Sequence, residues 1–372
     1  MAARTAIGLD IGTSGVRAAE LSIARGAVTL DRFGQVALPI GAVRDGEVVD
    51  APMVAAAIRQ LWSATRFSTK RVILGVANQR VVVRSVELPW LPMEELRRSL
   101  PLQVVDMLPT PVDQAVLDFH PLEEVTGSRG RFLRGLLVAA SRESVLTNLR
   151  CVQAAGLRPA GVDLTGFAVL RAVNLMPIDD PGSEAVVDIG ARVTNVVVHR
   201  GGVPSFARIL LMGGQDITDA LAERTGTPLA EAEGIKQALG MVGQGGRLTS
   251  SASRDESLPV GRSILVPDVD LAAAVRSVES TAQTFIDEIR GSLDYYNASS
   301  PHHPISRVVI CGGGSLLRGL ADRLGQAVRV PVEEGRALGS LRLGRTGLTE
   351  DQLHQVEPLA ATPVGLALGG LR

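Results

Sequence analysis

The fold is decided by the stretch Thr5-Ala-Ile-Gly-Leu-Asp-Ile-Gly12, an apolar run that ends in Asp-Ile-Gly and continues into Thr13-Ser14-Gly15. A second stretch, Glu184-Ala-Val-Val-Asp-Ile-Gly190, ends in the same three residues about half a chain later. Each is followed by another strand-like run, a turn that contains Arg-Gly, and a third strand pattern. A pattern that returns at this spacing predicts two related halves, each of which opens with a β-meander.

Beyond these two stretches, strand patterns alternate with helical patterns. The strand patterns lie at 71–76, 81–86, 136–140 and 305–311. The helical patterns lie at 51–65, 91–108 with a break or kink at Pro101, 142–155 and 269–297. Such alternation indicates an α/β fold. Residues 240–262 are rich in glycine and serine, and we expect a mobile loop there.

The bulk composition excludes several classes of function. The formal net charge is −1 and aromatic residues make up only 3% of the chain, which argues against nucleic-acid binding. The two cysteines, Cys151 and Cys311, are far apart and have no metal-ligand spacing. The N-terminus lacks a signal-peptide pattern, and no stretch approaches the roughly 20 apolar residues of a membrane span. We therefore expect a cytoplasmic protein without direct membrane insertion, which reaches a membrane only through a partner.

The Asp-Ile-Gly turns carry chemistry that suits a phosphate. Gly12 and Gly15 permit a tight strand-to-strand turn, which can aim hydroxyls and successive backbone N–H groups at an anion. A carboxylate at the strand end, Asp10, suits Mg²⁺ held largely through water. One such hairpin is more often an ordinary turn. The second copy at Asp188 favours two hairpins that clamp a triphosphate across a cleft.

Three further features are weaker on their own. The run Gly312-Gly313-Gly314-Ser315 follows a buried strand pattern, where glycine lets the backbone approach a ligand or simply allows tight packing. Glu233 and Lys236 lie three residues apart on a predicted helix, a spacing that is more often a solvated ion pair than a binding site. Gly213-Gly214 precedes that helical region. No P-loop and no Ser/His/Asp arrangement is present in the sequence.

The order of these elements resembles the actin, sugar kinase and heat-shock chaperone superfamily, and within it the PilM family of actin-like proteins of type IV pilus assembly. The resemblance covers nearly the whole chain. It rests on five stretches of sequence: Gly8 to Glu20, Glu87-Leu-Pro89, Ala154 to Pro159 with Val162-Asp163, Ala232-Glu-Gly-Ile-Lys236 and Glu288 to Tyr296. The segment from Leu102 to Phe119 is similar to the inserted subdomain of this branch.

The resemblance implies an actin-like two-domain fold with duplicated ribonuclease H-like halves. The first domain is expected at 1–183, with the inserted subdomain at about 81–155. The second is expected at 184–372, with a nucleotide-side subdomain at about 215–304.

The resemblance also implies an ATP–Mg²⁺ site. Asp10 and Asp188 are the expected metal ligands, largely through water. Glu233 and Lys236 are expected at the ribose and adenine, and the glycine run at the adenosine pocket. The expected nucleotide-binding residues are Asp10, Gly12, Thr13, Ser14, Arg17, Asp188, Gly190, Thr194, Gly213, Gly214, Glu233, Lys236, Gly312, Gly313, Gly314 and Ser315.

Two positions depart from the family pattern. Arg17 stands where relatives commonly carry a phosphate-contacting lysine. The catalytic acid of bacterial actins has no clear match, because its place falls near Thr165, with Asp163 two residues earlier as the candidate. In-line water attack needs a residue that orients the water. We therefore expect ATP binding with slow or absent hydrolysis, and a role as a nucleotide-responsive scaffold.

The family resemblance further implies a partner, the cytoplasmic N-terminal tail of the inner-membrane protein PilN. Docking in a groove within about 81–155 would recruit the protein to the inner face of the membrane, beside other pilus components. The alternatives are an FtsA-type cell-division actin, a small-molecule kinase of the same superfamily, and a type II secretion relative. The C-terminal segment 361–372 lacks the basic amphipathic pattern of an FtsA membrane helix.

Overall fold

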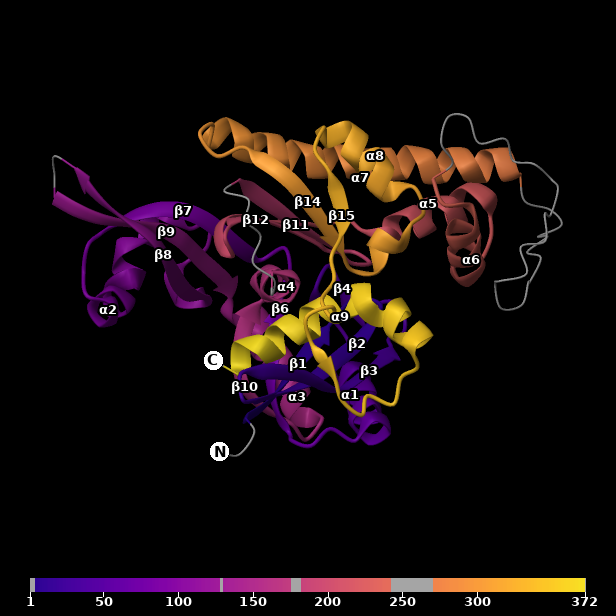
Figure 1. Ribbon diagram of the computed structural model, residues 1–372, viewed down its shortest axis with the longest axis horizontal. Coiled ribbons are helices and arrows are strands. Elements are labelled where there is room, and N and C mark those ends of the chain that lie inside the picture. The colour runs from indigo at the N-terminus through magenta and orange to yellow at the C-terminus, as the bar shows by residue number, and fades with distance from the viewer. Residues whose placement is uncertain (1–3, 128–129, 175–181, 242–269, 372) are drawn as a thin grey trace.

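The computed structural model describes residues 4–127, 130–174, 182–241 and 270–371. Its core is a pair of mixed sheets that lie one above the other in Figure 1. The predicted mobile loop at 240–262 falls outside the described residues from position 242 onward. Within the described ranges, no helix combines the length and the apolar character needed to cross a membrane.

The two sheets repeat one topology, which confirms the duplication predicted from the Asp-Ile-Gly stretches. In each sheet, the strand that carries Asp-Ile-Gly pairs antiparallel with the next strand of the meander and parallel with a later strand on its other side. The first sheet has the order β10 (Arg158–Leu164), β6 (Arg71–Val76), β1 (Arg4–Ile11), β2 (Gly15–Ala24), β3 (Ala27–Ala37), β16 (Arg342–Leu343). The second has the order β13 (Val203–Leu210), β12 (Thr194–Arg200), β11 (Ser183–Ile189), β14 (Ile305–Cys311), β15 (Val332–Glu334).

Two helices, α4 (Thr165–Val173) and α9 (Glu350–Gly370), lie between the two sheets (Figure 1). Their apolar side chains join residues from both sheets in one buried cluster. The sequence analysis did not predict α9, whose glycines and two internal prolines, Pro358 and Pro363, are poor helix formers. Its helical state comes from burial, because nearly every side chain from Ala360 to Leu368 is inaccessible to water.

Glycines let α9 pack this closely. A Cβ atom on Gly365 would overlap the carbonyl oxygen of Ala168 in α4, and one on Gly8 of β1 would overlap the carbonyl oxygen of Pro363. Neither position has an unusual backbone conformation, so the requirement is for space rather than for a left-handed turn.

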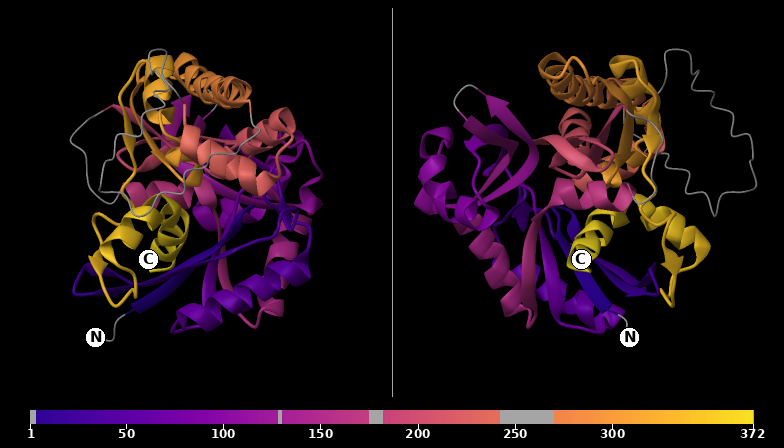
Figure 2. Two further views of the ribbon diagram at one scale, coloured as in Figure 1. Left: turned by 90° about the vertical axis from the view of Figure 1, so that its right-hand side faces the viewer. Right: turned by 60° about the vertical axis from the view of Figure 1, so that its left-hand side comes forward.

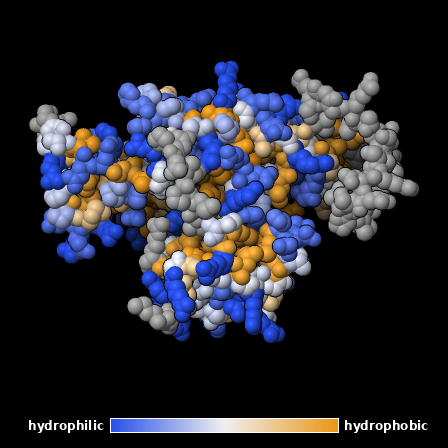
Figure 3. All heavy atoms as spheres, in the orientation of Figure 1, coloured by the Kyte–Doolittle hydropathy of each residue, from blue (hydrophilic) through white to orange (hydrophobic). Residues whose placement is uncertain are grey.

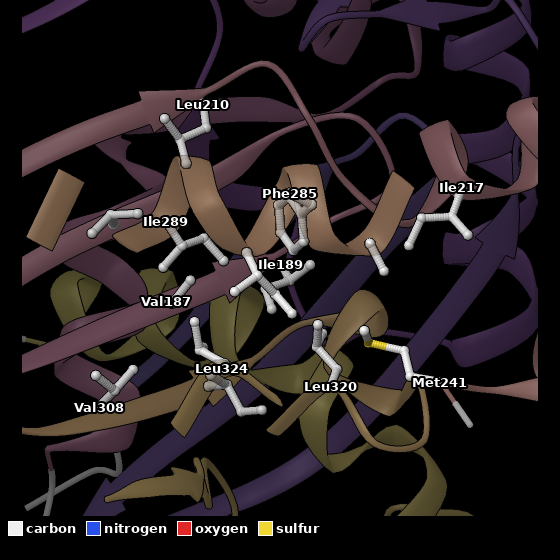
Figure 4. Close-up of a cluster of buried hydrophobic side chains, with 14 of the residues drawn as sticks. Val187, Ile189, Leu210, Ile217, Met241, Phe285, Ile289, Val308, Leu320 and Leu324 are labelled. Atoms are coloured by element: carbon white, nitrogen blue, oxygen red, sulfur yellow. The ribbon is translucent and has the colours of Figure 1, made fainter. Parts of the chain in front are cut away.

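Further helices cover the outer faces of both sheets (Figure 2). Helices α1 (Ala51–Thr65) and α3 (Arg142–Ala154) pack on the first sheet. The second sheet carries α5 (Gly214–Thr225), α6 (Leu229–Leu239), α7 (Leu271–Ser299) and α8 (Leu320–Val328). Figure 4 shows Phe285 and Ile289 of α7 packed over Ile189 and Val187 of β11. The predicted helix at 51–65 and strands at 71–76 and 305–311 are confirmed to the residue.

A third, smaller sheet projects to one side of the molecule (Figure 1). Its order is β7 (Val81–Pro89), β9 (Gly130–Ser141), β8 (Ala115–Gly127), and α2 (Met93–Gln103) packs against it. The helix predicted at 91–108 is shorter in the structure. Pro101 does not end it, because the helix continues for two residues past this proline. A short 3-10 turn, Val105–Met107, follows it, and another, Val112–Gln114, precedes β8. The remaining short elements are β4 (Val43–Arg44), β5 (Glu47–Val48) and a 3-10 turn at Gly313–Leu316.

Replacing Gly365 by alanine should destabilise the protein, because the added methyl group overlaps the backbone of α4. We expect a loss of about 3 kcal/mol in the free energy of unfolding, the upper end for overpacking. Gly291, a helical glycine of α7, has open space around its Cβ position, so Gly291→Ala is the matched control. The control should gain up to about 1 kcal/mol from helix propensity. Equal effects in chemical denaturation would contradict the packing of α9.

Candidate functional site

The first Asp-Ile-Gly hairpin joins β1 to β2. The N–H of Gly12 donates to the carbonyl of Gly15 at 3.0 Å, which closes the turn. Arg17 reaches back over the turn, with Nη1 at 3.6 Å from Oδ2 of Asp10 and Nη2 donating to Oγ of Ser14 at 3.2 Å. Its Nε is buried without a hydrogen-bond partner among the described residues. The guanidinium therefore retains a donor beside the turn, an arrangement that favours an anion there.

The second hairpin, between β11 and β12, repeats this geometry. The N–H of Gly190 donates to the carbonyl of Val193, again at 3.0 Å. At its tip, Arg192 forms ion pairs with Asp216 and Asp219 of α5, which fix the hairpin against that helix. Thr194, which we expected at the phosphate, is fully buried and donates its hydroxyl to the carbonyl of Met212 at 2.8 Å.

The carboxylates of the two hairpins have raised pKa values. Burial and then the negative charge of Asp10 raise the pKa of Asp188 to about 6, against a hydrogen bond from Asn195 at 3.1 Å. Burial also raises the pKa of Asp10, and the charge of Arg17 offsets part of this effect. Two acidic groups beside a single arginine leave negative charge that a cation can neutralise.

The glycine positions bring three backbone segments together. Gly312 has φ +81°, and a Cβ there would overlap the carbonyl oxygen of Ile189. The N–H of Gly214 donates to the carbonyl of Gly190 at 3.0 Å, and a Cβ on Gly213 would overlap that same oxygen. The glycine loop and the start of α5 therefore both rest on the second hairpin, which explains why side chains are excluded there.

Buried Lys236 and half-buried Glu233 form a hydrogen-bonded cluster rather than the solvated pair that their spacing suggested. The ammonium group of Lys236 donates to the carbonyl of Gly214 at 2.9 Å, to Oγ1 of Thr218 at 2.9 Å and to Oε2 of Glu233 at 2.8 Å. Burial raises the pKa of Glu233, but the hydrogen bonds from Lys236 and Thr218 outweigh it and lower that pKa overall. The hydrogen bonds of Lys236 thus connect α6 to the first turn of α5.

These elements line one cleft of about 660 Å³ between the two halves. Of the expected residues, the cleft brings together Asp10, Gly12, Thr13, Ser14, Arg17, Asp188, Gly190, Gly214, Glu233, Lys236, Gly312, Gly313 and Gly314. Thr194, Gly213 and Ser315 do not line it. Ser315 instead donates its hydroxyl to the carbonyl of Gly312 at 2.8 Å. A second cavity of about 410 Å³ continues the cleft past Gly313, Gly314 and Lys236 toward Phe285 and Leu320.

Several polar residues of the cleft were missed by sequence reasoning. They are Asn148, Asn195, Gln215, Thr218 and Thr362. Asn195 could have been found, because hairpin register places it opposite Asp188. Asn148 and Thr362 come from α3 and α9, and no local pattern marks either of them.

Asp163, the expected catalytic acid, does not reach this cleft. Its carboxylate forms an ion pair with Arg171 of α4 and lines a separate cavity of about 590 Å³ beside the small sheet. The geometric reason is that β10 ends at Leu164 and α4 begins at Thr165, so Thr165 lines the cleft and Asp163 does not. The expected position of Asp163 is corrected accordingly.

The donor set of the cleft fits a polyphosphate and a hard cation. The unpartnered Nε of Arg17 and the two glycine-bearing turns suit phosphate oxygens. Among the described residues, no group of three or more His, Cys, Asp or Glu side chains could hold a metal. A magnesium ion here would therefore depend on Asp10 and Asp188 together with water and phosphate oxygens, the usual mixture for this ion.

Duplicated sheets of this topology, with paired hairpins at an interdomain cleft, define the actin-like fold. Residues 8–244 match the family described as type IV pilus assembly protein PilM, more than half of the chain. The chain belongs to the PilM family. Residues 185–357 also match the family of the cell division protein FtsA.

Solved structures agree with this assignment. The structure of a PilM-PilN type IV pilus biogenesis complex superposes with a TM-score of 0.82, at 25% identity, over 99% of this chain and 98% of that chain. MreB5 of Spiroplasma citri bound to ADP has a TM-score of 0.51 at 13% identity, over 98% of this chain and 95% of that one, which shows the fold alone.

Curated relatives include the cell division protein FtsA of Bacillus subtilis, which is 24% identical over 258 residues. That match covers 63% of this chain, and the chain spans 58% of the length of that FtsA. FtsA of Escherichia coli strain K12 is 26% identical over 62% of this chain and 53% of its own length. The match to FtsA is thus less complete than the match to the PilM-PilN structure.

Asp188→Asn should stabilise the protein in EDTA without nucleotide. Because the pKa of Asp188 is raised from 3.8 to about 6 in the folded state, ionisation penalises folding as the pH rises through that window. At pH 7.5 the gain should be on the order of 2 to 3 kcal/mol, and by pH 4 it should vanish. Thermal unfolding across pH measures it. A variant less stable than wild type by the same margin at every pH would show that the carboxylate supports the fold.

Proposed function

We propose that this chain is a cytoplasmic, ATP-binding adaptor of type IV pilus assembly, which docks onto the N-terminal tail of PilN at the inner face of the cytoplasmic membrane. The observation that carries the nucleotide part is the pair of Asp-Ile-Gly hairpins at one cleft, with the Nε of Arg17 buried and unpartnered beside them. When bound, Mg²⁺ neutralises phosphate and carboxylate charge together.

Each half supplies one part of the proposed site. Thr13, Ser14 and Arg17 of the first hairpin would hold the terminal phosphates, and the turn at Gly190 would face them from the second half. The side of the cleft lined by Glu233, Lys236 and the glycine loop would take the nucleoside, because the second cavity extends there between α6 and α7. Asp10 and Asp188 would hold magnesium largely through water.

We propose that hydrolysis is slow. The acidic residues that line the cleft in the described structure are Asp10, Asp188 and Glu233. Glu233 is engaged by Lys236 and Thr218, and the other two face the proposed metal position. Gln215, which could orient a water molecule, donates its amide to Asp219 at 2.9 Å. Thr165 offers only a hydroxyl, so the set suits binding better than in-line attack by water.

The cavity beside the small sheet is the proposed docking groove for the PilN tail. It is lined by β8, β9, β10, α4 and the start of β13. Val116, Val162 and Val203, all in its lining, are unusually exposed, at 42%, 42% and 50%. An extended peptide could bury these apolar side chains, while Asp118, His120 and the pair Asp163–Arg171 offer polar contacts. The similar PilM-PilN structure supports PilN as the partner.

Helix α4 connects the two proposed sites. Its first residue, Thr165, lines the nucleotide cleft, and Phe167, Leu170 and Arg171 line the groove. Arg171 also donates to the carbonyl of Gly365 in α9 at 3.2 Å, and α9 reaches the cleft through Pro358, Leu359 and Thr362. Both halves of the protein line both cavities. Closure of the cleft around a nucleotide would therefore change the width of the groove, which makes docking responsive to nucleotide.

Asp10→Ala should abolish Mg²⁺-dependent ATP binding, with at least about a hundredfold loss of affinity, because it removes one of two charges that hold the cation. Isothermal titration with ATP and excess Mg²⁺ measures the loss. Asp322→Ala, which removes an exposed carboxylate of α8, is the matched control and should bind as wild type does. Tight Mg²⁺-dependent binding by Asp10→Ala would refute the assignment of the cleft.

Val162→Asp should weaken binding of a PilN N-terminal peptide at least about tenfold, because it places a charge in an apolar groove. Fluorescence anisotropy with the labelled peptide measures the affinity, with ATP binding as the check on folding. Leu343→Asp is the matched control, since Leu343 of β16 is 52% exposed and lies outside the groove. If both variants bind equally well, the peptide docks elsewhere.

A further inference from the structure

One end of the first sheet carries a concentration of basic side chains. It is the end at which β1, β6 and β10 begin and β2 turns into β3. Strand β10 lies at this side of the first sheet in Figure 1, and Figure 3 shows hydrophilic side chains at the lower left of the molecule. We call this surface the basic end. Its residues are Arg4, Arg25, Arg66, Lys70, Arg71 and Arg158, all exposed.

Strand register places these residues together. Arg71 and Arg158 are direct partners across β6 and β10, and the N–H of Arg158 donates to the carbonyl of Lys70 at 2.8 Å. Arg4 pairs with Ile23, so Arg25 follows two residues later in the β2–β3 turn at the same edge. Arg66 is the C-cap residue that follows α1, five positions before β6 begins at Arg71. Four segments that are distant in sequence thus meet at one end of the sheet.

Leaving Arg4 aside, the positive charge of the basic end is uncompensated within the part of the chain that the structure describes. The described segments that form it, 4–9, 22–30, 59–72, 148–160 and 364–371, contain no aspartate or glutamate. Arg25, Arg66, Lys70, Arg71 and Arg158 make no ion pair with any carboxylate of the described chain. The nearby carboxylate of Glu20 is buried, accepts from Ser68 and is paired with Arg32 at 2.9 Å. The net charge of −1 hides this asymmetry, because acidic residues lie elsewhere.

We infer that the basic end is a docking surface for anionic phospholipid headgroups of a membrane. Clustered guanidinium and ammonium groups on a surface attract anionic lipid without inserting into it. Nucleic acid is disfavoured because the aromatic rings nearest the surface, Trp62 and Phe67, pack on each other at 4.7 Å between centroids. They are therefore not free to stack on bases.

The choice of a membrane rests in part on the proposed function, because the docking groove and the basic end share strand β10. Arg158 begins this strand, and Val162, Asp163 and Leu164 at its other end line the groove. Six residues of strand span about 20 Å. A tail that emerges from the bilayer could therefore occupy the groove while the basic end rests on the same leaflet. The two contacts would act together through a high effective concentration.

The test is flotation of the full chain with vesicles of phosphatidylcholine, alone or mixed with phosphatidylglycerol, at about 0.05 M and about 0.5 M salt. Wild type should float only with the anionic vesicles, and high salt should release it. The variant Lys70→Gln/Arg71→Gln/Arg158→Gln should bind them roughly a hundredfold less well, since each basic residue near an anionic surface strengthens binding about fivefold. Arg25→Asn/Arg66→Asn provides a second variant, because asparagine tolerates the left-handed backbone at both positions.

The matched control, Arg97→Gln/Arg208→Gln/Arg224→Gln, removes the same charge from exposed positions elsewhere. It should float as wild type does. Absence of wild-type binding to anionic vesicles, equal loss in the control, equal binding to neutral vesicles, or tighter binding to duplex DNA would each overturn the inference. ATP and PilN-peptide affinities are measured on the same variants. Both affinities should be unchanged in these variants. A failure of the nucleotide or docking proposal can therefore be distinguished from a failure of the proposal that the basic end binds anionic lipid.

Discussion

The cleft between the two halves is built around two carboxylates, Asp10 and Asp188. Each lies at the end of the central strand of a sheet, and burial raises the pKa of both groups. The charge of Asp10 adds to the increase at Asp188. A single guanidinium, from Arg17, lies beside them. Keeping two such groups in one site costs folding free energy that a cation and a polyphosphate can return on binding. The duplicated halves thus form a site whose buried charge is unfavourable without a ligand. A bound cation and polyphosphate would compensate it.

Helices α4 and α9, which lie between the two sheets, connect the cleft to the proposed docking groove. Helices α4 and α9 contact each other at Gly365 without room for a methyl group, so a shift of one helix moves the other. The cleft and the groove are each lined by both halves, and residues of α4 line both of them. A small change in the angle between the halves would therefore change both cavities, as expected of a nucleotide-responsive adaptor.

Local sequence patterns predicted much of the fold, because the information was local. The repeat of Asp-Ile-Gly gave the duplication, and alternation and helical spacing gave α1, β6 and β14 to the residue. Helix α9 was missed because its glycines and prolines oppose helix formation, and only tertiary burial overrides them. Strand β8 was missed, although β7, the other antiparallel partner of β9, was predicted, because the pairing of β8 with β9 depends on contacts between strands.

The residues of the cleft likewise divide into those that a local sequence pattern marks and those that tertiary packing brings there. Residues on the hairpins and the glycine loop were predicted, since turn chemistry marks them. Asn148 and Thr362 arrive from helices whose packing no single-sequence pattern encodes. Asp163 was expected at the cleft because it lies two residues before Thr165. In the structure α4 begins at Thr165, and the side chain of Asp163 lines the groove instead. The basic end was hidden by a net charge that averages over the molecule.

The most direct measurement is the affinity of the wild-type protein for ATP by isothermal titration, in excess Mg²⁺ and again in EDTA. Two carboxylates with one arginine predict tight binding with magnesium and a loss of at least about a hundredfold without it, because the triphosphate would then meet uncompensated negative charge. Equal affinity in the two buffers would contradict the account, since the paired carboxylates would then have no part in holding the nucleotide.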